Sequence, residues 1–471
     1  MKSLHCIVLL FLLSVWAFAS VPQYTITDLD GRSDYYLCSS AADINNDCHV
    51  VGEFYIDWWR IAGISDYKSH AFLWQDGQMT DLGTAEDMTY CGASAINDLG
   101  QIIGLAYVYH GHSSSSIPMS WHDSAFIWGY FHGDEAIPMD INEKGQIVGG
   151  VSDWLDSSFA FIMDNSVMYR MGYGTDPWDE MSWCAEGYDA ATSINDLRVI
   201  VGWSKDCHYR YHAFMWKPFE SITDLGVPVT DTWWPWLKIN NRSIVAGTYG
   251  VHPYARTTRA FTWRDGAVSD LPGLGGQSSI ARDINEGGQI VGSAQRADGS
   301  YTPVMWQDSK VTDLFPLISG SSKWDYITPQ AINDRGYIVG QGGLFPRDWR
   351  EKRYHAILLT PIIQVEVDIL PNQIKLGSNA ALPVAILGST DFDPSQVDPA
   401  TVTLAGALVA VNAKGKYKSS LGDVNGDGRP DLVLHFITAQ LSLQPGDTSV
   451  LLEGKTRDGI PIAGEDTISV N

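Results

Sequence analysis

The sequence has few basic residues, and several common functional motifs are absent. It contains 31 Lys and Arg against 55 Asp and Glu, a formal net charge of -24. Because such a chain repels polyanions, nucleic acid is excluded as a partner. Neither CxxC nor CxxCH occurs, which disfavours zinc and haem sites, and HExxH, GxSxG, P-loop and GxGxxG motifs are missing. These absences remove the common hydrolase and nucleotide-binding classes.

After residue 20 no apolar run is long enough to cross a bilayer. Residues 1–20 have the features of a signal peptide: Lys2, an apolar run from Ile7 to Phe18, and a small-x-small cleavage site at 17–19. A retained membrane anchor is the alternative. The sequence therefore predicts a secreted, extracellular protein, which could also be periplasmic or associated with the cell surface, and we expect a monomer.

Export permits disulfides among the five cysteines that remain after signal removal. Cys184 and Cys207 lie almost symmetrically about one predicted hairpin, so they form one candidate pair. Cys38 and Cys91 occupy nearly equal positions in neighbouring repeats and form a second, which leaves Cys48 unpaired. The pairing remains open at this point.

Internal repetition is the strongest positive signal. Copies such as SIARDINEGGQIVG share an Asn at positions 45, 97, 142, 195, 240, 285 and 333. Elements such as HAFLW at 70–74, SAFIW at 124–128 and HAFMW at 212–216 lie between the copies, and TDL or SDL often follows. Each unit holds about four short strands separated by Asn, Asp and Gly turns, without helical periodicity. Seven such units predict an all-β fold, a seven-bladed β-propeller, with a solenoid as the alternative.

The two ends of the array favour a closed ring. The seventh copy lacks a TDL element, whereas the mature chain opens with TITDL at 25–29. The N-terminal strand would complete the last blade, which removes the free sheet edges that a solenoid would have to cap. We therefore place the propeller at residues 22–361.

These units resemble the extracellular repeats named for the tripeptide His-Ala-Phe, the HAF repeats. The resemblance rests on the LPGLGGQSSIARDINEGGQIVG segment and on HAFLW, and it covers residues 22–361. It implies secretion and assigns no activity.

Loop lengths indicate which face of the ring binds a ligand. The loops between strands one and two are tight, whereas those between strands two and three are longer and rich in aromatic residues. Aromatic rings beside hydrogen-bond donors suit a hydroxyl-rich ligand, so we predict glycan binding, with ordinary packing as the alternative. The predicted ligand-binding residues are Trp58, Trp59, Arg60, Tyr107, Trp121, Tyr209, Arg210, Trp233, Trp234, Tyr254 and Arg256.

Two other function classes remain open. One is a polysaccharide lyase that acts by β-elimination on a uronate-containing glycan, with His208, Tyr188, Arg210 and His122 as catalytic candidates. The other is a scaffold for protein ligands.

After Pro361 the tryptophans, the cysteines and the repeat all end, so residues 362–471 form a second domain. Short apolar runs broken by Gly, Pro and Asp predict a β-sandwich. Within it, DVNGDGRPD has the spacing of a calcium loop. The expected ligands of a structural Ca²⁺ are Asp423, Asn425, Asp427, Asp431 and the carbonyl of Arg429.

Overall fold

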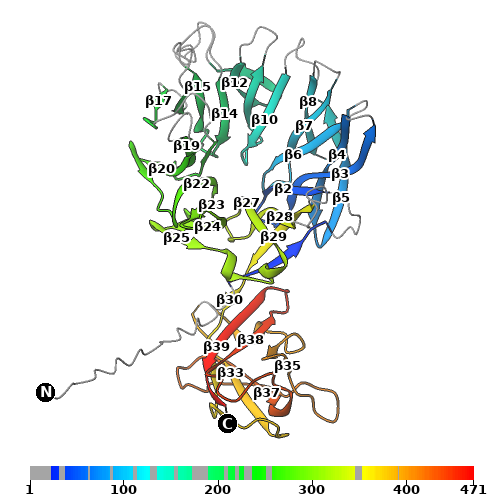
Figure 1. Ribbon diagram of the computed structural model, residues 1–471, viewed down its shortest axis with the longest axis vertical. Coiled ribbons are helices and arrows are strands. Elements are labelled where there is room, and N and C mark those ends of the chain that lie inside the picture. The colour runs from blue at the N-terminus through cyan, green and yellow to red at the C-terminus, as the bar shows by residue number, and fades with distance from the viewer. Residues whose placement is uncertain are drawn as a thin grey trace, which may run out of the picture. The chain divides into compact units, whose positions relative to one another are not determined.

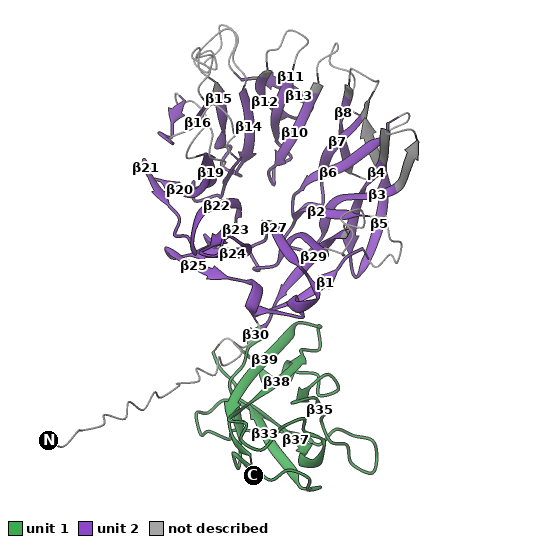
Figure 2. Cartoon of the chain, in the orientation of Figure 1, with its two compact units in different colours: residues 1–22, 363–471 green, residues 23–362 purple. Residues whose placement is uncertain are grey.

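The computed structural model describes residues 23–30, 38–61, 64–84, 88–109, 114–122, 124–127, 135–152, 158–171, 189–205, 211–217, 222–227, 236–250, 257–344, 353–390 and 392–470. These residues fall into two compact units, divided between Ile362 and Ile363 (Figure 2). Both units are all-β, and their helical turns are short 3-10 segments. Among these residues no helix is long and apolar enough to cross a membrane.

The described strands of the first unit form seven sheets, which we number in chain order (Figure 1). Sheet 1 is β2 (Ser39–Ile44), β3 (Val50–Ile61), β4 (Ile64–Gln75) and β5 (Gln78–Gly83). Sheet 2 is β6 (Tyr90–Ile96), β7 (Ile102–Tyr109), β8 (Ser114–His122) and β9 (Ser124–Ile127). Sheet 3 is β10 (Glu135–Ile141), β11 (Ile147–Ser152), β12 (Ser158–Asp164) and β13 (Val167–Arg170). Sheet 4 is β14 (Asp189–Ile194), β15 (Ile200–Lys205), β16 (Tyr211–Trp216) and β17 (Thr223–Asp224).

The remaining three sheets follow the same plan. Sheet 5 is β18 (Trp236–Ile239), β19 (Val245–Gly250), β20 (Thr258–Arg264) and β21 (Ala267–Asp270). Sheet 6 is β22 (Gly275–Ile284), β23 (Ile290–Arg296), β24 (Tyr301–Gln307) and β25 (Lys310–Asp313). Sheet 7 is β27 (Tyr326–Ile332), β28 (Ile338–Leu344), β29 (Arg353–Pro361), β1 (Tyr24–Asp28) and β26 (Ile318–Ser319).

The glycine that ends each IVG motif is explained by close contact between the first two strands of a sheet. The first strand carries a bulge, as between Ala281 and Asp283 in sheet 6. Because of this approach, a Cβ at Gly292 would lie 1.9 Å from the carbonyl oxygen of Ile280. Only glycine fits there, so this repeat position is fixed by packing.

The last sheet of the first unit includes a strand from the N-terminal part of the chain. β1 lies antiparallel to β29, with Ile26 opposite Leu359, as predicted from the orphan TDL element. One apolar core also holds side chains from sheets 1 and 7, including Phe72 and Leu358. The order of sheets therefore returns to its beginning around a common centre (Figure 1).

The repeated asparagines hold consecutive sheets together. The Oδ1 of Asn195 accepts hydrogen bonds from the main-chain N–H groups of Leu197 and Val199, the predicted turn role. Its Nδ2 donates to the carbonyl of Asn240 in the next sheet, a contact that sequence reasoning missed. All seven asparagines make this second bond over 2.9 to 3.2 Å, and Asn333 closes the circle by donating to Asn45.

The His of HAF pairs with the Asp of TDL. His70 Nδ1 lies 2.9 Å from Asp81 Oδ1, and His212 lies 3.1 Å from Asp224. The same pair forms where the ring closes, because His355 lies 2.7 Å from Asp28. The two motifs therefore recur together because they hydrogen-bond between the third and fourth strands of one sheet.

Sheet 2 corrects the predicted repeat boundaries. SAFIW at 124–128 was predicted as the third strand, but residues 124–127 form β9, the fourth strand. The third strand is β8, in which Trp121 lies opposite Ile102. This is the position of the repeated Trp, as in sheet 6, where Trp306 lies opposite Ile290. The predicted long loop between the second and third strands is correspondingly shorter.

The second unit contains two main sheets that share one apolar core. One has the order β30 (Ile363–Gln364), β39 (Pro461–Thr467), β38 (Ser449–Lys455), β34 (Thr403–Leu404), β35 (Ala407–Leu408). The other has the order β31 (Val367–Ile369), β33 (Ala381–Ile386), β37 (Asp431–Ile437), β36 (Ser419–Gly422). A short pair, β32 (Gln373–Ile374) with β40 (Ser469–Val470), completes the unit.

Candidate functional site

The residue after each repeated Asn forms a second closed circle. The main-chain N–H of Glu143 donates to Asp196 Oδ1 over 2.8 Å, and each of the other six positions makes the equivalent bond to its neighbour. Five of the seven side chains are carboxylates, which surround one mouth of the central channel. Burial raises the pKa values of Glu143 and Glu286 above their ordinary range. The members are Asn46, Asp98, Glu143, Asp196, Asn241, Glu286 and Asp334.

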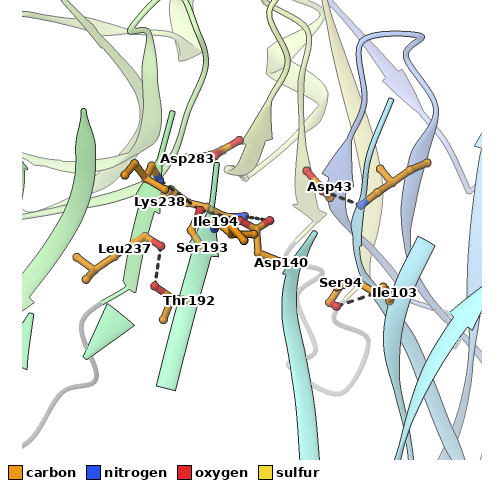
Figure 3. Close-up of polar contacts among 12 residues, drawn as sticks. Asp43, Ser94, Ile103, Asp140, Thr192, Ser193, Ile194, Leu237, Lys238 and Asp283 are labelled. Atoms are coloured by element: carbon orange, nitrogen blue, oxygen red, sulfur yellow. Dashed lines mark hydrogen bonds and ion pairs between the residues drawn. The ribbon is translucent and has the colours of Figure 1, made fainter. Parts of the chain in front are cut away.

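Below this mouth lies a cavity of about 200 Å³, lined by the first strands of the sheets. Besides the carboxylates of the mouth, its lining includes the charged side chains of Asp43, Asp140, Lys238 and Asp283 (Figure 3). Lys238 Nζ lies 3.0 Å from Asp140 Oδ1, although one residue belongs to sheet 5 and the other to sheet 3. One lysine therefore faces the buried carboxyl group of Asp140 and the half-buried carboxyl groups of Asp43 and Asp283.

Each of these aspartates also connects two neighbouring sheets. Asp43 accepts a hydrogen bond from the N–H of Ile96, over 2.9 Å. Asp140 accepts bonds from Ile194 and from the hydroxyl of Ser193, and Asp283 accepts one from Ile332. The cavity network is thus part of the framework of the ring.

The pKa values in the cavity reflect burial and the single lysine. Burial raises the pKa of Asp43 to about 7 and that of Asp283 to about 6, while the charge of Lys238 opposes both shifts. Burial alone would lower the pKa of Lys238, but the carboxylates of Asp140, Asp283 and Asp43 raise it above its ordinary value. Lys238 therefore remains charged and offsets the repulsion among the aspartates.

A row of tyrosines lies at the opposite end of three adjacent sheets. Tyr90 and Tyr326 stand seven residues before the repeated Asn of their sheets, and Tyr55 and Tyr107 stand ten after. Tyr354 lies opposite Gly343, which in turn lies opposite Tyr326. We call Tyr55, Tyr90, Tyr107, Tyr326 and Tyr354 the tyrosine row; all five are half-buried.

The tyrosine row is closely packed. The rings of Tyr90 and Tyr107 stack with centroids 4.6 Å apart and 10° between their planes. Tyr55 and Tyr354 meet edge to face at 6.4 Å, and their hydroxyl groups are hydrogen-bonded. The Tyr326 ring covers Gly343, where a Cβ would lie 1.9 Å from it. The glycine therefore makes space for a ring.

Burial raises the pKa values of Tyr55, Tyr326 and Tyr354. Their hydroxyl groups stay protonated at neutral pH, so they act as hydrogen-bond donors and acceptors rather than as bases. Aromatic faces with neutral hydroxyl groups can stack against and hydrogen-bond to a sugar ring.

The structure describes only part of the predicted ligand-binding set. Trp58, Trp59 and Arg60 lie in β3, but their side chains are outside the description. Tyr107 belongs to the tyrosine row. Trp121, predicted as a ligand contact, is instead 6% exposed in the core of sheet 2, because it takes the repeated core Trp position.

The remaining candidates lie outside the described residues. This applies to Tyr209, Arg210, Trp233, Trp234, Tyr254 and Arg256, and to the lyase candidates Tyr188 and His208. His122 ends β8, with its side chain undescribed. Tyr188 and Trp233 stand seven residues before Asn195 and Asn240, the position of Tyr90 and Tyr326. Alignment of the copies on their Asn would therefore have revealed the tyrosine row.

None of the three cysteines that the structure describes, Cys38, Cys48 and Cys91, forms a disulfide, which corrects the predicted Cys38–Cys91 pair. Cys91 is fully buried in an apolar core with Val51 and Ala71, and Cys38 is not part of that core. Cys48 takes the left-handed turn position, with φ 63°, that Gly100 takes in the next copy. Cys184 and Cys207 lie outside the described residues.

The predicted calcium loop is mostly exposed, with one exception. Asp423 accepts hydrogen bonds from the N–H groups of Gly426, Asp427 and Gly428. Asp431, predicted as a fifth ligand, is fully buried, and its two oxygens accept bonds from main-chain N–H groups at 2.7 and 2.8 Å. Each oxygen of Asp431 therefore already has a main-chain donor. Within the described residues no three His, Cys, Asp or Glu side chains converge as metal ligands do.

No family model and no curated protein matches the chain. Among solved structures it is similar to TolB from Acinetobacter baumannii, at 11% identity and a TM-score of 0.33, over 66% of this chain and 63% of that one. The lectin of Aleuria aurantia in complex with Fucα1-6GlcNAc gives 10% identity and a TM-score of 0.30, over 50% and 79%. The β-propeller domain of the trilobed protease from Pyrococcus furiosus gives 11% and 0.32, over 62% and 98%. These similarities concern the fold and not the ligand.

Proposed function

We propose that this chain is a secreted, ligand-binding seven-bladed β-propeller followed by a β-sandwich, and that its long-loop face binds an extracellular glycan. Support for the propeller comes from seven consecutive sheets, from the pairing of β1 with β29, and from the closed circle of asparagine hydrogen bonds. Two sheets around one core support the sandwich.

The observation that carries the glycan proposal is the tyrosine row. Aromatic rings provide flat faces for the apolar side of a sugar, and their neutral hydroxyl groups bond to its hydroxyls. The row lies at the end of sheets 7, 1 and 2 toward which the β3–β4 hairpin, with Trp58 and Trp59 in β3, extends. The predicted long loop between the second and third strands of sheet 1 is therefore largely replaced by paired strand. The opposite mouth holds carboxylates already engaged by main-chain donors, so it offers fewer free groups.

Replacing Tyr107 by Ala tests this proposal. The change removes one of the two stacked rings, and we expect glycan affinity to fall about 10-fold or more, as for a partly desolvated aromatic anchor. A glycan array identifies a ligand, and titration calorimetry then compares the variants. Tyr169→Ala is the control, because Tyr169 is 44% exposed on β13, outside the row.

Absence of glycan binding by the unmodified chain would refute the proposal, as would equal affinities for both variants. No described residue favours the lyase alternative. The same oligosaccharides can be followed for the ultraviolet absorbance of an unsaturated product, which would establish the lyase instead.

We propose that Asp423, Asn425, Asp427 and the carbonyl of Arg429 bind a structural Ca²⁺ in the second unit. These are hard oxygen donors on one exposed turn, the ligand type that Ca²⁺ prefers. When bound, the ion would neutralise the two carboxylates and tie together the ends of β36 and β37.

We expect Ca²⁺ to raise the unfolding temperature of the second unit by several degrees, and a chelator to reverse the shift. Calorimetry of the full chain measures this effect. Asp423→Asn should abolish it, whereas Asp308→Asn, on an exposed turn of the first unit, should leave it intact. A transition insensitive to both Ca²⁺ and chelator would exclude the site.

A further inference from the structure

Glu53 lies beside the tyrosine row, and its carboxyl group has no role assigned so far. It lies in β3 two residues before Tyr55, and its charge acts on Tyr55 and on Tyr354. Its side chain lies against the main chain of β6: a Cβ at Gly92 would be 3.3 Å from Glu53 Oε2 and 3.4 Å from its Cβ. The glycine leaves the space that Glu53 occupies.

The carboxyl group of Glu53 makes no hydrogen bond or ion pair with any residue that the structure describes, although the residue is half-buried. Burial is the cause that raises its pKa above the ordinary value. A carboxyl group that is shielded from water and has no hydrogen-bond donor carries a desolvation free energy. A ligand that donates a hydrogen bond to it offsets that free energy. The carboxylates of the cavity and of the other mouth differ, because main-chain groups already bond to them.

The described groups around Glu53 are otherwise neutral near pH 7 or already paired. Burial raises the pKa values of Tyr55 and Tyr354, and it raises that of Cys91 to about 11. Asp81, whose charge also reaches Cys91, is paired with His70. The other titratable neighbours are the thiol of Cys38 and the phenols of Tyr90 and Tyr326. Glu53 therefore carries the unpaired negative charge of the row.

We propose that Glu53 determines the specificity of the tyrosine row: it accepts hydrogen bonds from the hydroxyl groups of an uncharged saccharide and excludes uronates. This inference rests on the proposed glycan-binding function. A neutral sugar presents a hydroxymethyl donor where the matching uronate presents a carboxylate. Two carboxylates at hydrogen-bond distance in a partly desolvated site repel each other strongly.

The test uses the full chain and matched pairs of oligosaccharides: glucose with glucuronate, galactose with galacturonate, and mannose with mannuronate. At about pH 7.5 we expect the neutral member of the bound pair to bind about 10-fold more tightly or better. Glu53→Gln keeps the size and the acceptor oxygen, so it should bind the uronate within about 3-fold of the neutral member. Glu453→Gln, an exposed change in the second unit, is the control and should keep the original ratio.

A second readout is the pH dependence of the ratio. Because burial raises the pKa of Glu53, lowering the pH protonates Glu53 before a uronate loses its charge, so the discrimination of the unmodified chain should shrink as the pH falls. The Gln variant should show no such change. Equal binding of both members by the unmodified chain, or a ratio unchanged by Glu53→Gln, overturns this inference and leaves the glycan site standing. Failure to bind any saccharide overturns both.

Discussion

Replacing Lys238 by Met is expected to lower the free energy of unfolding by about 3 to 5 kcal/mol, the usual cost of removing one partner of a buried ion pair. Lys238 is the described cation facing Asp43, Asp140 and Asp283, and its side chain is 18% exposed. Met fills a similar volume but leaves the carboxylates uncompensated. Denaturant unfolding monitored by tryptophan fluorescence measures the loss.

The pH dependence of the Lys238→Met variant distinguishes charge from packing. A carboxyl group whose folded pKa is raised binds more protons when folded, so its contribution to stability decreases as the pH rises through that pKa. With Lys238 absent, the pKa values of Asp43 and Asp283 rise beyond about 7 and about 6. The loss of unfolding free energy caused by Lys238→Met should therefore be larger at about pH 8 than at about pH 5. Lys310→Met, on an exposed hairpin, is the control; a loss equal at both pH values would contradict the charge interpretation.

Removing β1 should open the ring. Burial of the Tyr24 and Leu29 side chains alone contributes about 3 to 6 kcal/mol, and loss of the strand also exposes the edge of β29. A chain that begins at Gly31 should therefore unfold at a much lower denaturant concentration than one that begins at Pro22, and it should aggregate.

A peptide of residues 23–30 provides the matched control for the truncation. Added in excess, it should pair with β29 and restore the unfolding midpoint, whereas the same peptide with Ile26→Pro should not. Equal midpoints for the two chains would show that closure by β1 does not stabilise the ring.

The architecture was predictable because the repeat combines local turn chemistry with strand patterning. The shared Asn, the IVG glycine and the orphan TDL element correctly predicted hairpins, strand pairs and the pairing of the N-terminal strand with the last sheet. The assignment of sheet 2 was wrong because its fourth strand, SAFI, has the sequence pattern that the third strand has in other sheets. Trp121 was consequently predicted as a loop residue, although it lies in the third strand.

The charged cavity could not be read from the repeat. Asp43, Asp140 and Asp283 share their repeat position with Lys238 and with small residues such as Ala95, so the position shows no common chemistry along the chain. Their relation appears only when seven first strands surround one axis, and Asp140 meets Lys238 across 98 residues of sequence. The pairing of Glu53 with Gly92 is likewise a contact between sheets that local patterns cannot show.

The His355–Asp28 contact joins two residues separated by 327 positions. A ribosome must therefore have synthesised almost the whole repeat array before the last sheet can receive its outer strand. Until then each nascent sheet has a neighbour on one side only, and the edge of the growing arc can accept a strand from another molecule. The pairing of β1 with β29 thus comes last, and it converts an aggregation-prone intermediate with an open sheet edge into a closed ring.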